Sequence, residues 1–106
     1  MLYKVDFTPE AQVQLAGIYR YIADAASPTI AKRYTDAVVT YCETLAKFPG
    51  RAPGRNDIRA GLRITHYKGR TIIAFAIDEK TMCVSIIGVF YGGQDYETAL
   101  QIGSDE

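Results

Sequence analysis

Hydrophobic and polar residues alternate through three runs in the second half of the chain, within residues 59–91. Each run is rich in β-branched and aromatic residues, and two short polar segments, 68–69 and 78–81, separate the runs. This pattern predicts an antiparallel meander of three strands. A shorter run at residues 3–7 also alternates, and it predicts an additional strand with one buried face.

The length of the first turn decides which side chains of the meander share a face of the sheet. A two-residue turn at Lys68 and Gly69 is expected, because glycine adopts positive φ without steric cost. One face is then mostly apolar and carries Leu62, Ile64, His66, Thr71, Ile73, Phe75, Val84, Ile86 and Phe90. The other face carries Arg63, Thr65, Tyr67, Arg70, Ile72, Ala74, Ser85, Ile87, Val89 and Tyr91. We therefore expect one face to pack in the core and the other to hold functional residues.

Two amphipathic helices are predicted between the first strand and the meander. Thr8 and Ser27 are each followed by proline, which is typical of a hydroxyl N-cap with proline at the first helical position. Apolar residues then recur at steps of three and four. They are Ala11, Leu15, Ile18 and Ile22 in the first helix, and Ala31, Tyr34, Val38, Tyr41, Leu45 and Phe48 in the second. The short connection between the helices predicts an antiparallel helix hairpin that packs on the apolar face.

The last segment predicts a short helix within residues 94–102, where Tyr96 and Leu100 are four residues apart. The expected fold is an α+β domain with the order β-α-α-β-β-β, an antiparallel sheet and the helix hairpin on one face. Residues 1–102 are expected to form this single domain, and residues 103–106 a disordered tail.

Charge and cysteine content narrow the possible functions. The 106 residues include 12 basic and 12 acidic side chains, so no overall charge attracts nucleic acid or a membrane. Cys42 and Cys83 are not spaced like zinc ligands and are too few for a disulfide framework. No signal peptide is recognisable, and no apolar run approaches the roughly 20 residues of a membrane helix. A reduced cytoplasmic protein without a cofactor or metal is expected.

Candidate chemistry is limited to the face with arginines and tyrosines. His66 is the only histidine and has no evident acid or nucleophile partner, so no catalytic triad is expected. Paired carboxylates, a phosphate-binding glycine loop and a metal-ligand cluster are also missing from the sequence. Arginines bind phosphate oxygens and tyrosines stack on bases. Without a group that moves protons, this face suits binding better than cleavage; the alternative is that its arginines only cover the sheet and pair with acids.

Five segments resemble the ParE branch of the RelE/ParE toxin superfamily. They are Phe7-Thr8-Pro9-Glu10-Ala11, Ile18-Tyr19-Arg20-Tyr21-Ile22-Ala23, Leu45-Ala46-Lys47-Phe48-Pro49, Ile58-Arg59-Ala60-Gly61-Leu62-Arg63, and Val89-Phe90-Tyr91-Gly92-Gly93-Gln94-Asp95-Tyr96. The resemblance spans residues 2–100 and implies a toxin of a type II toxin–antitoxin module. Such toxins inhibit DNA gyrase, and a ParD-like antitoxin neutralises them by wrapping along the helix hairpin and the sheet.

RelE relatives with the same fold instead cut mRNA on the ribosome, with several basic residues and a C-terminal tyrosine. By resemblance, Arg63 and Arg70 stand where two of these basic residues would lie, and Tyr96 stands near the place of the tyrosine. Thr65 replaces a lysine, and residues 93–94 replace an arginine. A gyrase-binding toxin that is not an enzyme is therefore expected. An mRNA endonuclease and a non-toxic, degenerate binding module are the alternatives.

Two groups of residues are predicted to bind partners. The surface for the target, DNA gyrase, is predicted to contain Arg59, Arg63, Arg70, Tyr91, Gln94 and Tyr96. The surface for the ParD-like antitoxin is predicted to contain Leu15, Ile18, Tyr19, Tyr34, Val38 and Tyr41. Each helix buries one stripe against the sheet, so some of the second group must belong to the core. No catalytic residue, no membrane contact and no sequence-specific binding of nucleic acid is expected.

Overall fold

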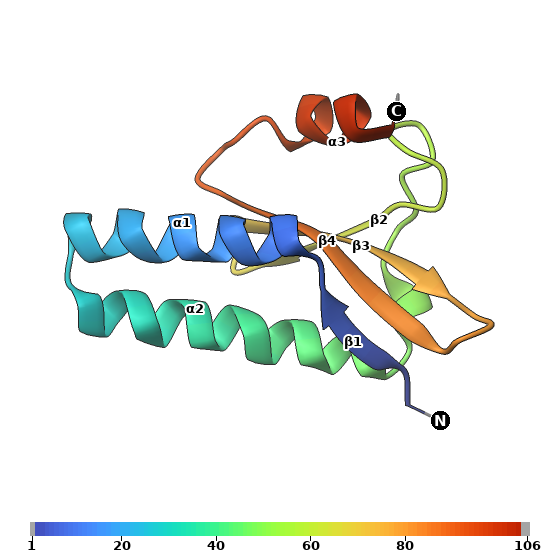
Figure 1. Cartoon of the computed structure of the whole chain (residues 1–106), viewed down its shortest axis with the longest axis horizontal. Helices are drawn as coiled ribbons and strands as arrows, with labels where there is room; N and C mark the ends of the chain where they lie inside the picture. The colour runs from blue at the N-terminus through green and yellow to red at the C-terminus, as the bar shows by residue number, and fades with distance from the viewer. Residues whose placement is uncertain (1, 105–106) are drawn as a thin grey trace.

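The structure is a computed structural model that describes residues 2–104, with side chains described for residues 2–101. Its elements follow the predicted order (Figure 1). They are β1 (Lys4–Phe7), α1 (Pro9–Ala25), α2 (Pro28–Glu43), η1 (Thr44–Ala46), η2 (Pro49–Arg51), β2 (Arg63–Tyr67), β3 (Thr71–Asp78), β4 (Cys83–Tyr91) and α3 (Tyr96–Ser104). The backbone of α3 thus extends into the segment predicted as a tail, and residues 105 and 106 lie outside the described residues.

Both long helices begin at the predicted caps. Thr8 Oγ1 accepts a hydrogen bond from the backbone N–H of Ala11 at 3.2 Å, and Ser27 Oγ accepts one from Ile30 at 3.1 Å. The helices lie side by side and antiparallel (Figure 1). The second helix is shorter than its apolar stripe predicted. It ends at Glu43, and Phe48 lies outside it. The α conformation is disfavoured for a residue that precedes proline, as Phe48 does.

The sheet has the strand order β1-β4-β3-β2 and is mixed. The meander β2-β3-β4 is antiparallel as predicted, but β1 pairs with β4 in parallel. The prediction of a wholly antiparallel sheet is wrong in this one pairing. The outer edge of β2 is already bridged to Gly54, so the edge of β4 is the one that β1 joins.

The loop between β2 and β3 is one residue longer than predicted. Tyr67 pairs with Thr71, which leaves residues 68–70 as a three-residue loop in which Lys68 and Gly69 have φ of 52° and 71°. A slip of one residue moves every side chain of a strand to the opposite face. Arg63, Thr65 and Tyr67 therefore face the helices, whereas Leu62, Ile64 and His66 do not, and their predicted faces are wrong.

A β-bulge changes the faces of β4. The ladder between β3 and β4 shifts register beside Ala74 and Phe75, and Ile87 is the residue without a partner. Alternation along β4 is therefore reversed after Ile87. The residues of β4 that face the helices are Val84, Ile86, Val89 and Tyr91. Val89 and Tyr91 thus lie on the face opposite to the prediction, and so does Phe90, which packs on the far side of the sheet.

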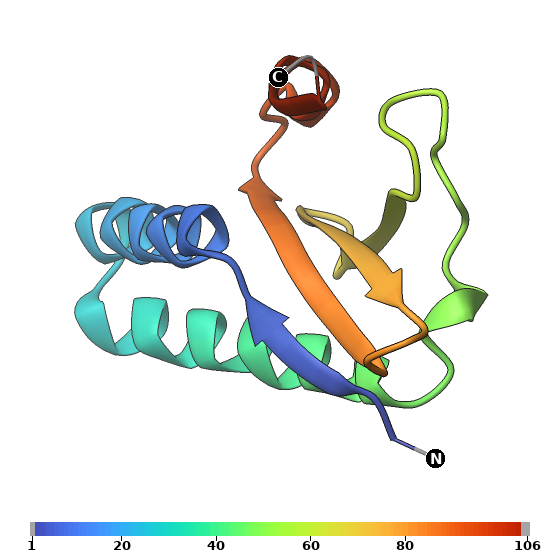
Figure 2. The same cartoon turned by 45° about the vertical axis from the view of Figure 1, so that its right-hand side comes forward.

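Each face of the sheet carries an apolar cluster. The helix face holds Ala11, Ile18, Ile22, Ala31, Val38, Cys42, Ile73, Phe75, Val84, Ile86 and Val89. The opposite face holds Ile58, Leu62, Ile64, Ala74, Phe90 and Leu100. The helix hairpin covers the first face as predicted, and α3 and the 52–62 loop lie on the other side of the sheet (Figure 2). The expected open polar face is therefore wrong, because α3 and the loop bury apolar side chains against it.

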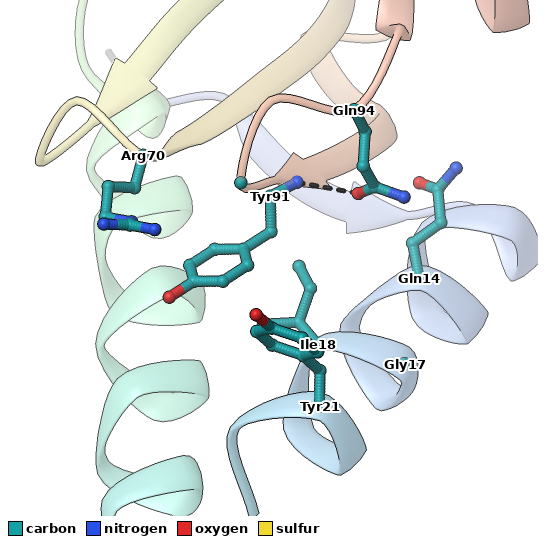
Figure 3. Close-up of a pocket in the computed structure, with 8 residues that line it drawn as sticks. Gln14, Gly17, Ile18, Tyr21, Arg70, Tyr91 and Gln94 are labelled. Carbon is teal, nitrogen blue, oxygen red and sulfur yellow. Dashed lines mark hydrogen bonds between the residues drawn. The ribbon is translucent and has the colours of Figure 1, made fainter. Parts of the chain in front are cut away.

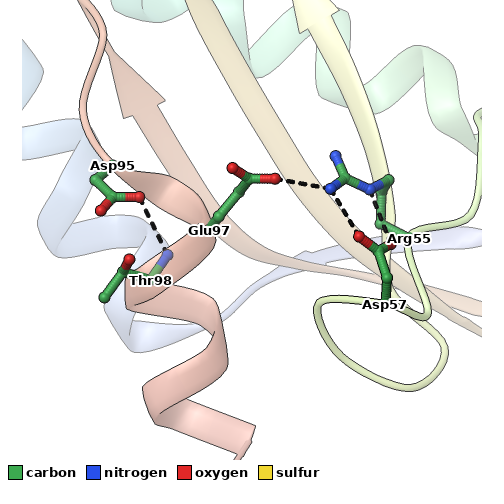
Figure 4. A network of polar contacts seen from close by, with 5 residues as sticks. All are labelled: Arg55, Asp57, Asp95, Glu97 and Thr98. Atoms are coloured by element: carbon green, nitrogen blue, oxygen red, sulfur yellow. Dashed lines mark hydrogen bonds and ion pairs between the residues drawn. The ribbon is translucent and has the colours of Figure 1, made fainter.

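Arg55 joins the 52–62 loop to α3 (Figure 4). Its guanidinium donates to both carboxylate oxygens of Asp57 at 2.9 Å and to Glu97 Oε2 at 2.7 Å. The hydrogen bonds to Asp57 and Glu97 raise the pKa of Arg55, and Arg55 lowers the pKa of Asp57. This triad holds α3 over the second apolar cluster.

Arg55→Met is therefore expected to speed hydrogen exchange of the α3 amides. Because the folded-state pKa of Asp57 is lowered, its ion pair stabilises the fold above the ordinary carboxyl pKa of about 4 and stops doing so as pH falls through the lowered value. The difference in melting temperature from the wild type should thus be present at pH 7 and shrink as the pH falls through the lowered pKa of Asp57. Arg33→Met is the control, since no carboxylate pairs with Arg33 among residues 2–101. Equal exchange of α3 in both variants would contradict the role of the triad.

Candidate functional site

A pocket of about 420 Å³ lies between α1 and the end of β4 (Figure 3). Its lining comes from three parts of the chain that are far apart in sequence. The residues are Gln14, Gly17, Ile18 and Tyr21 from α1, Arg70 from the loop between β2 and β3, and Tyr91, Gly92 and Gln94 from the end of the meander. The helix hairpin and the meander must both be folded for this pocket to exist, so it is a tertiary feature. We call it the Arg70 pocket.

Backbone hydrogen bonds hold the walls of the Arg70 pocket. Gln14 Oε1 accepts the N–H of Val89 at 2.7 Å, and Gln94 Oε1 accepts the N–H of Tyr91 at 2.8 Å. Figure 3 shows the second of these contacts, with both glutamines at one end of the pocket. The N–H of Gly92 donates to the carbonyl of Arg70 at 3.1 Å, and positive φ at Gly92 lets the chain turn there. All of these hydrogen bonds lie within the chain itself, so the pocket is preorganised.

The only charged side chain in this lining is Arg70. Its guanidinium Cζ lies 5.6 Å from the centroid of the Tyr91 ring, which is a cation–π contact. No carboxylate within residues 2–101 lies at ion-pair distance from Arg70. Because a guanidinium binds carboxylate and phosphate through two parallel hydrogen bonds, the pocket can receive an anionic group beside an aromatic surface.

Five tyrosines form a continuous row that begins at the Arg70 pocket. In order they are Tyr21, Tyr91, Tyr34, Tyr67 and Tyr41, with neighbouring ring centroids 5.9, 5.6, 5.9 and 5.2 Å apart. The Tyr34 hydroxyl bonds the buried Thr71 hydroxyl, and the Tyr41 hydroxyl bonds Thr65 at 3.0 Å. Burial raises the pKa of Tyr34. Two of the five hydroxyls are thus held by threonines of the sheet, and the row connects both helices to the sheet.

The structure brings together three of the six residues predicted to bind the target. Arg70, Tyr91 and Gln94 all line the Arg70 pocket. Arg63 does not, because it is the first residue of β2 and Arg70 follows the last. Its guanidinium donates to the carbonyls of residues 50 and 52, at 3.2 and 2.6 Å. Arg63 therefore holds the preceding loop in place.

The other two predicted target residues lie elsewhere. Tyr96 packs against Phe90 in the second apolar cluster, with ring centroids 6.1 Å apart. Arg59 is half-buried in the 52–62 loop, where its N–H bonds the carbonyl of Arg55 and its own carbonyl accepts the N–H of Leu62. Both residues are thus separated from the Arg70 pocket by the sheet or the loop.

The residues predicted to bind the antitoxin divide between core and surface. Val38 is fully buried and Ile18 is 5% exposed, so both pack in the first cluster. Leu15, Tyr19, Tyr34 and Tyr41 are half-buried at the edge of that cluster and keep surface that a partner can contact. This division, which the sequence left open, makes these four residues the accessible part of the predicted group.

Besides two glycines, two residues of the site were missed at the sequence level. Gln14 and Tyr21 lie on the flank of α1 beside its buried stripe, and Tyr21 is 64% exposed. Their spacing from Gly17, three and four residues, was the signal for a second surface on this helix. Among the residues that the structure describes, no group of three side chains could hold a metal ion, and no helix is both long and apolar enough to cross a membrane.

Comparison with known proteins points to one family. A model of the family described as the ParE toxin of the type II toxin–antitoxin system parDE matches residues 5–96. A structure from the chromosomal ParDE system of P. aeruginosa superposes with a TM-score of 0.74 at 17% identity, covering 86% of this chain and 97% of that one. No curated protein sequence matches the chain significantly.

Two further structures share the fold. A chain of the RelBE2 toxin–antitoxin complex from Mycobacterium tuberculosis superposes with a TM-score of 0.67 at 24% identity, covering 86% of this chain and 92% of that one. A mutant of free E. coli RelE toxin superposes with a TM-score of 0.61 at 11% identity, covering 97% of both chains. At these identities the structural matches establish the RelE/ParE-like fold alone.

Proposed function

Since this chain belongs to the ParE toxin family of type II toxin–antitoxin systems, we propose that it acts by binding DNA gyrase and that a ParD-like antitoxin neutralises it. Membership of the family makes the chain the toxin of a parDE-type module. The choice of gyrase follows from the resemblance to ParE toxins. We place the action in the cytoplasm, the compartment in which gyrase works.

The observation that carries this proposal is the Arg70 pocket. A guanidinium without an ion-pair partner in residues 2–101 lies over an aromatic ring, and backbone hydrogen bonds fix the surrounding wall. A preorganised site of this kind loses little conformational entropy when a partner binds. Its charge and its aromatic surface suit an acidic group on the target protein. These features support inhibition by binding.

One of the two basic residues that a ribonuclease would use on the sheet is engaged elsewhere. Arg63 donates hydrogen bonds to two loop carbonyls. His66 is exposed on the edge strand and faces away from the helices, whereas the Arg70 pocket lies on their side. These placements support a toxin that is not an enzyme over an mRNA endonuclease.

The antitoxin proposal rests on the family and on two relatives. One structural match comes from a ParDE system and another from a toxin–antitoxin complex. We propose that the half-buried edge of the helix hairpin, at Leu15, Tyr19, Tyr34 and Tyr41, contributes to the antitoxin contact. Aromatic residues held in one conformation are well suited to this role, because they provide large contact areas at low entropic cost.

The test combines purified chain with DNA gyrase, with and without the antitoxin from the neighbouring reading frame. We expect the chain to inhibit supercoiling and to leave cleaved DNA, and we expect the antitoxin to reverse both effects. Normal supercoiling together with cut transcripts in a translating extract would replace this proposal with the endonuclease. Normal growth of cells that contain the chain at high level would favour the non-toxic binding module.

A further inference from the structure

A second depression, of about 550 Å³, lies where α2 passes through η1 to η2. Figure 2 shows this end of α2 beside η2, at the edge of the sheet farthest from α3. Its lining is Tyr41, Thr44, Leu45, Lys47, Phe48, Pro49, Arg51, Ala52, Pro53 and Thr65. None of these residues belongs to the Arg70 pocket. The depression is therefore a separate surface, and its walls expose apolar and polar groups in about equal measure.

Phe48 is the unusual residue of this surface. Its backbone is left-handed, with φ 52° and ψ 50°, a conformation that is unfavourable for a bulky residue with a Cβ. Its side chain is nevertheless 71% exposed, so burial of the ring within this chain does not offset the cost of that backbone conformation. Strained backbone that displays a side chain to solvent is typical of a binding site. The exposed ring is thus best explained by a contact outside the chain.

Neighbouring residues hold Phe48 in this position. Pro49, directly after it, is buried, and the guanidinium of Arg51 lies 5.3 Å from the centroid of the Phe48 ring. Arg63 donates hydrogen bonds to the carbonyls of residues 50 and 52, and these bonds hold the turn that follows Phe48. The ring is therefore presented on a supported turn, which is how a preorganised anchor is built.

Charge indicates what kind of partner this surface fits. Lys47 and Arg51 are exposed beside Phe48, and within residues 2–101 neither forms an ion pair. Two such cations, next to a depression that also exposes apolar side chains, are complementary to an acidic segment that carries a large apolar side chain. A nucleic acid fits less well, because its grip needs many phosphate contacts and the lining of the depression has two cations.

We propose that Lys47, Phe48, Arg51 and the adjoining depression, together the Phe48 surface, dock an acidic peptide segment of a partner protein. A large apolar side chain of that segment sits in the depression against Phe48, and flanking carboxylates contact Lys47 and Arg51. The proposal is independent of the gyrase target, since it uses no residue of the Arg70 pocket.

Binding can be tested with a fluorescein-labelled peptide that has Leu-Trp at its centre and three glutamates on each side. Fluorescence anisotropy with the full chain is expected to show binding, and Phe48→Asn or Arg51→Glu should each weaken it about tenfold or more. Asparagine is chosen because it tolerates left-handed backbone. Val13→Asn, which removes an exposed apolar side chain that lines neither pocket, should leave binding unchanged. A wild-type chain that does not bind the peptide would overturn the proposal.

Two comparisons distinguish a docking role of Phe48 from a structural one and identify the kind of partner. Phe48→Gly removes the unfavourable left-handed side chain, so the melting temperature should not fall while peptide binding falls about tenfold or more. A lower melting temperature with unchanged binding would instead make Phe48 a structural residue and overturn the proposal. Equal binding of a peptide with glutamine in place of glutamate, stronger binding of single-stranded DNA, or a chain dimer that Phe48→Asn dissociates would each overturn it as well.

Discussion

Arg70→Glu is expected to lose most of its inhibition of gyrase while the chain still folds. Arg70 is exposed and lies over Tyr91 in the Arg70 pocket, so glutamate would place a carboxylate against the negative face of the ring. It would also repel an acidic group on the target. Loss of one partner from a charged contact costs about 2 to 5 kcal/mol of binding free energy. Affinity should therefore fall by about 30-fold or more.

The measurement is the concentration of chain that halves gyrase supercoiling, together with colony counts after induction. Arg33→Glu is the matched control, because it reverses an exposed arginine on α2 that does not line the pocket. Arg70→Lys keeps the charge without the planar guanidinium and should be intermediate. All three variants should have a free energy of unfolding within about 1 kcal/mol of the wild type. If Arg70→Glu inhibited as strongly as the wild type, the pocket would have no part in toxicity.

Phe75→Ala is expected to lower the free energy of unfolding by about 3 to 5 kcal/mol. Phe75 is the largest fully buried side chain among residues 2–101, and it packs in the first cluster under the helix hairpin. Alanine would remove its contacts and leave a cavity that the close-packed interior fills only partly. Since a domain of this size is stable by about 5 to 15 kcal/mol, the loss would be a large fraction of the total.

Urea denaturation measures this loss, and Phe48→Ala is its control. The chemical change is the same, but Phe48 is 71% exposed, so its unfolding free energy should change by less than about 0.5 kcal/mol. The contrast tests both apolar environments in one experiment. Similar losses for the two variants would mean that Phe48 packs against the rest of the chain, which would also contradict its proposed role at the surface.

Helices and their beginnings could be predicted because their determinants are local. A hydroxyl residue followed by proline starts each long helix, and the apolar stripe that follows identifies the buried side. The stripe misled at its end, because Leu45 lies in η1 after the end of α2 and Phe48 lies just before η2. The order of strands and helices could likewise be predicted, since hydrophobic periodicity and turn residues are properties of short segments.

The candidate site was harder to predict from the sequence. Arg70, Tyr91 and Gln94 were predicted to act together and do lie together, although the faces assigned to β2 and to the end of β4 were wrong. Arg63 was grouped with them and instead supports a loop. Gln14 was missed, because it comes from α1 and meets the bulged strand only after the helix hairpin packs.

From the sequence alone came the element order, the helix caps, the resemblance to ParE toxins and three of the residues that meet in the Arg70 pocket. Tertiary structure alone decided the parallel pairing of β1, the second apolar cluster and the partners of each arginine. The physical reason is the two-residue period of a strand: one extra residue in the 68–70 loop reverses the faces of β2 relative to β3, and one bulge at Ile87 reverses the faces at the end of β4. The length of a loop and the position of a bulge depend on packing across the whole domain, so the local sequence pattern does not predict them.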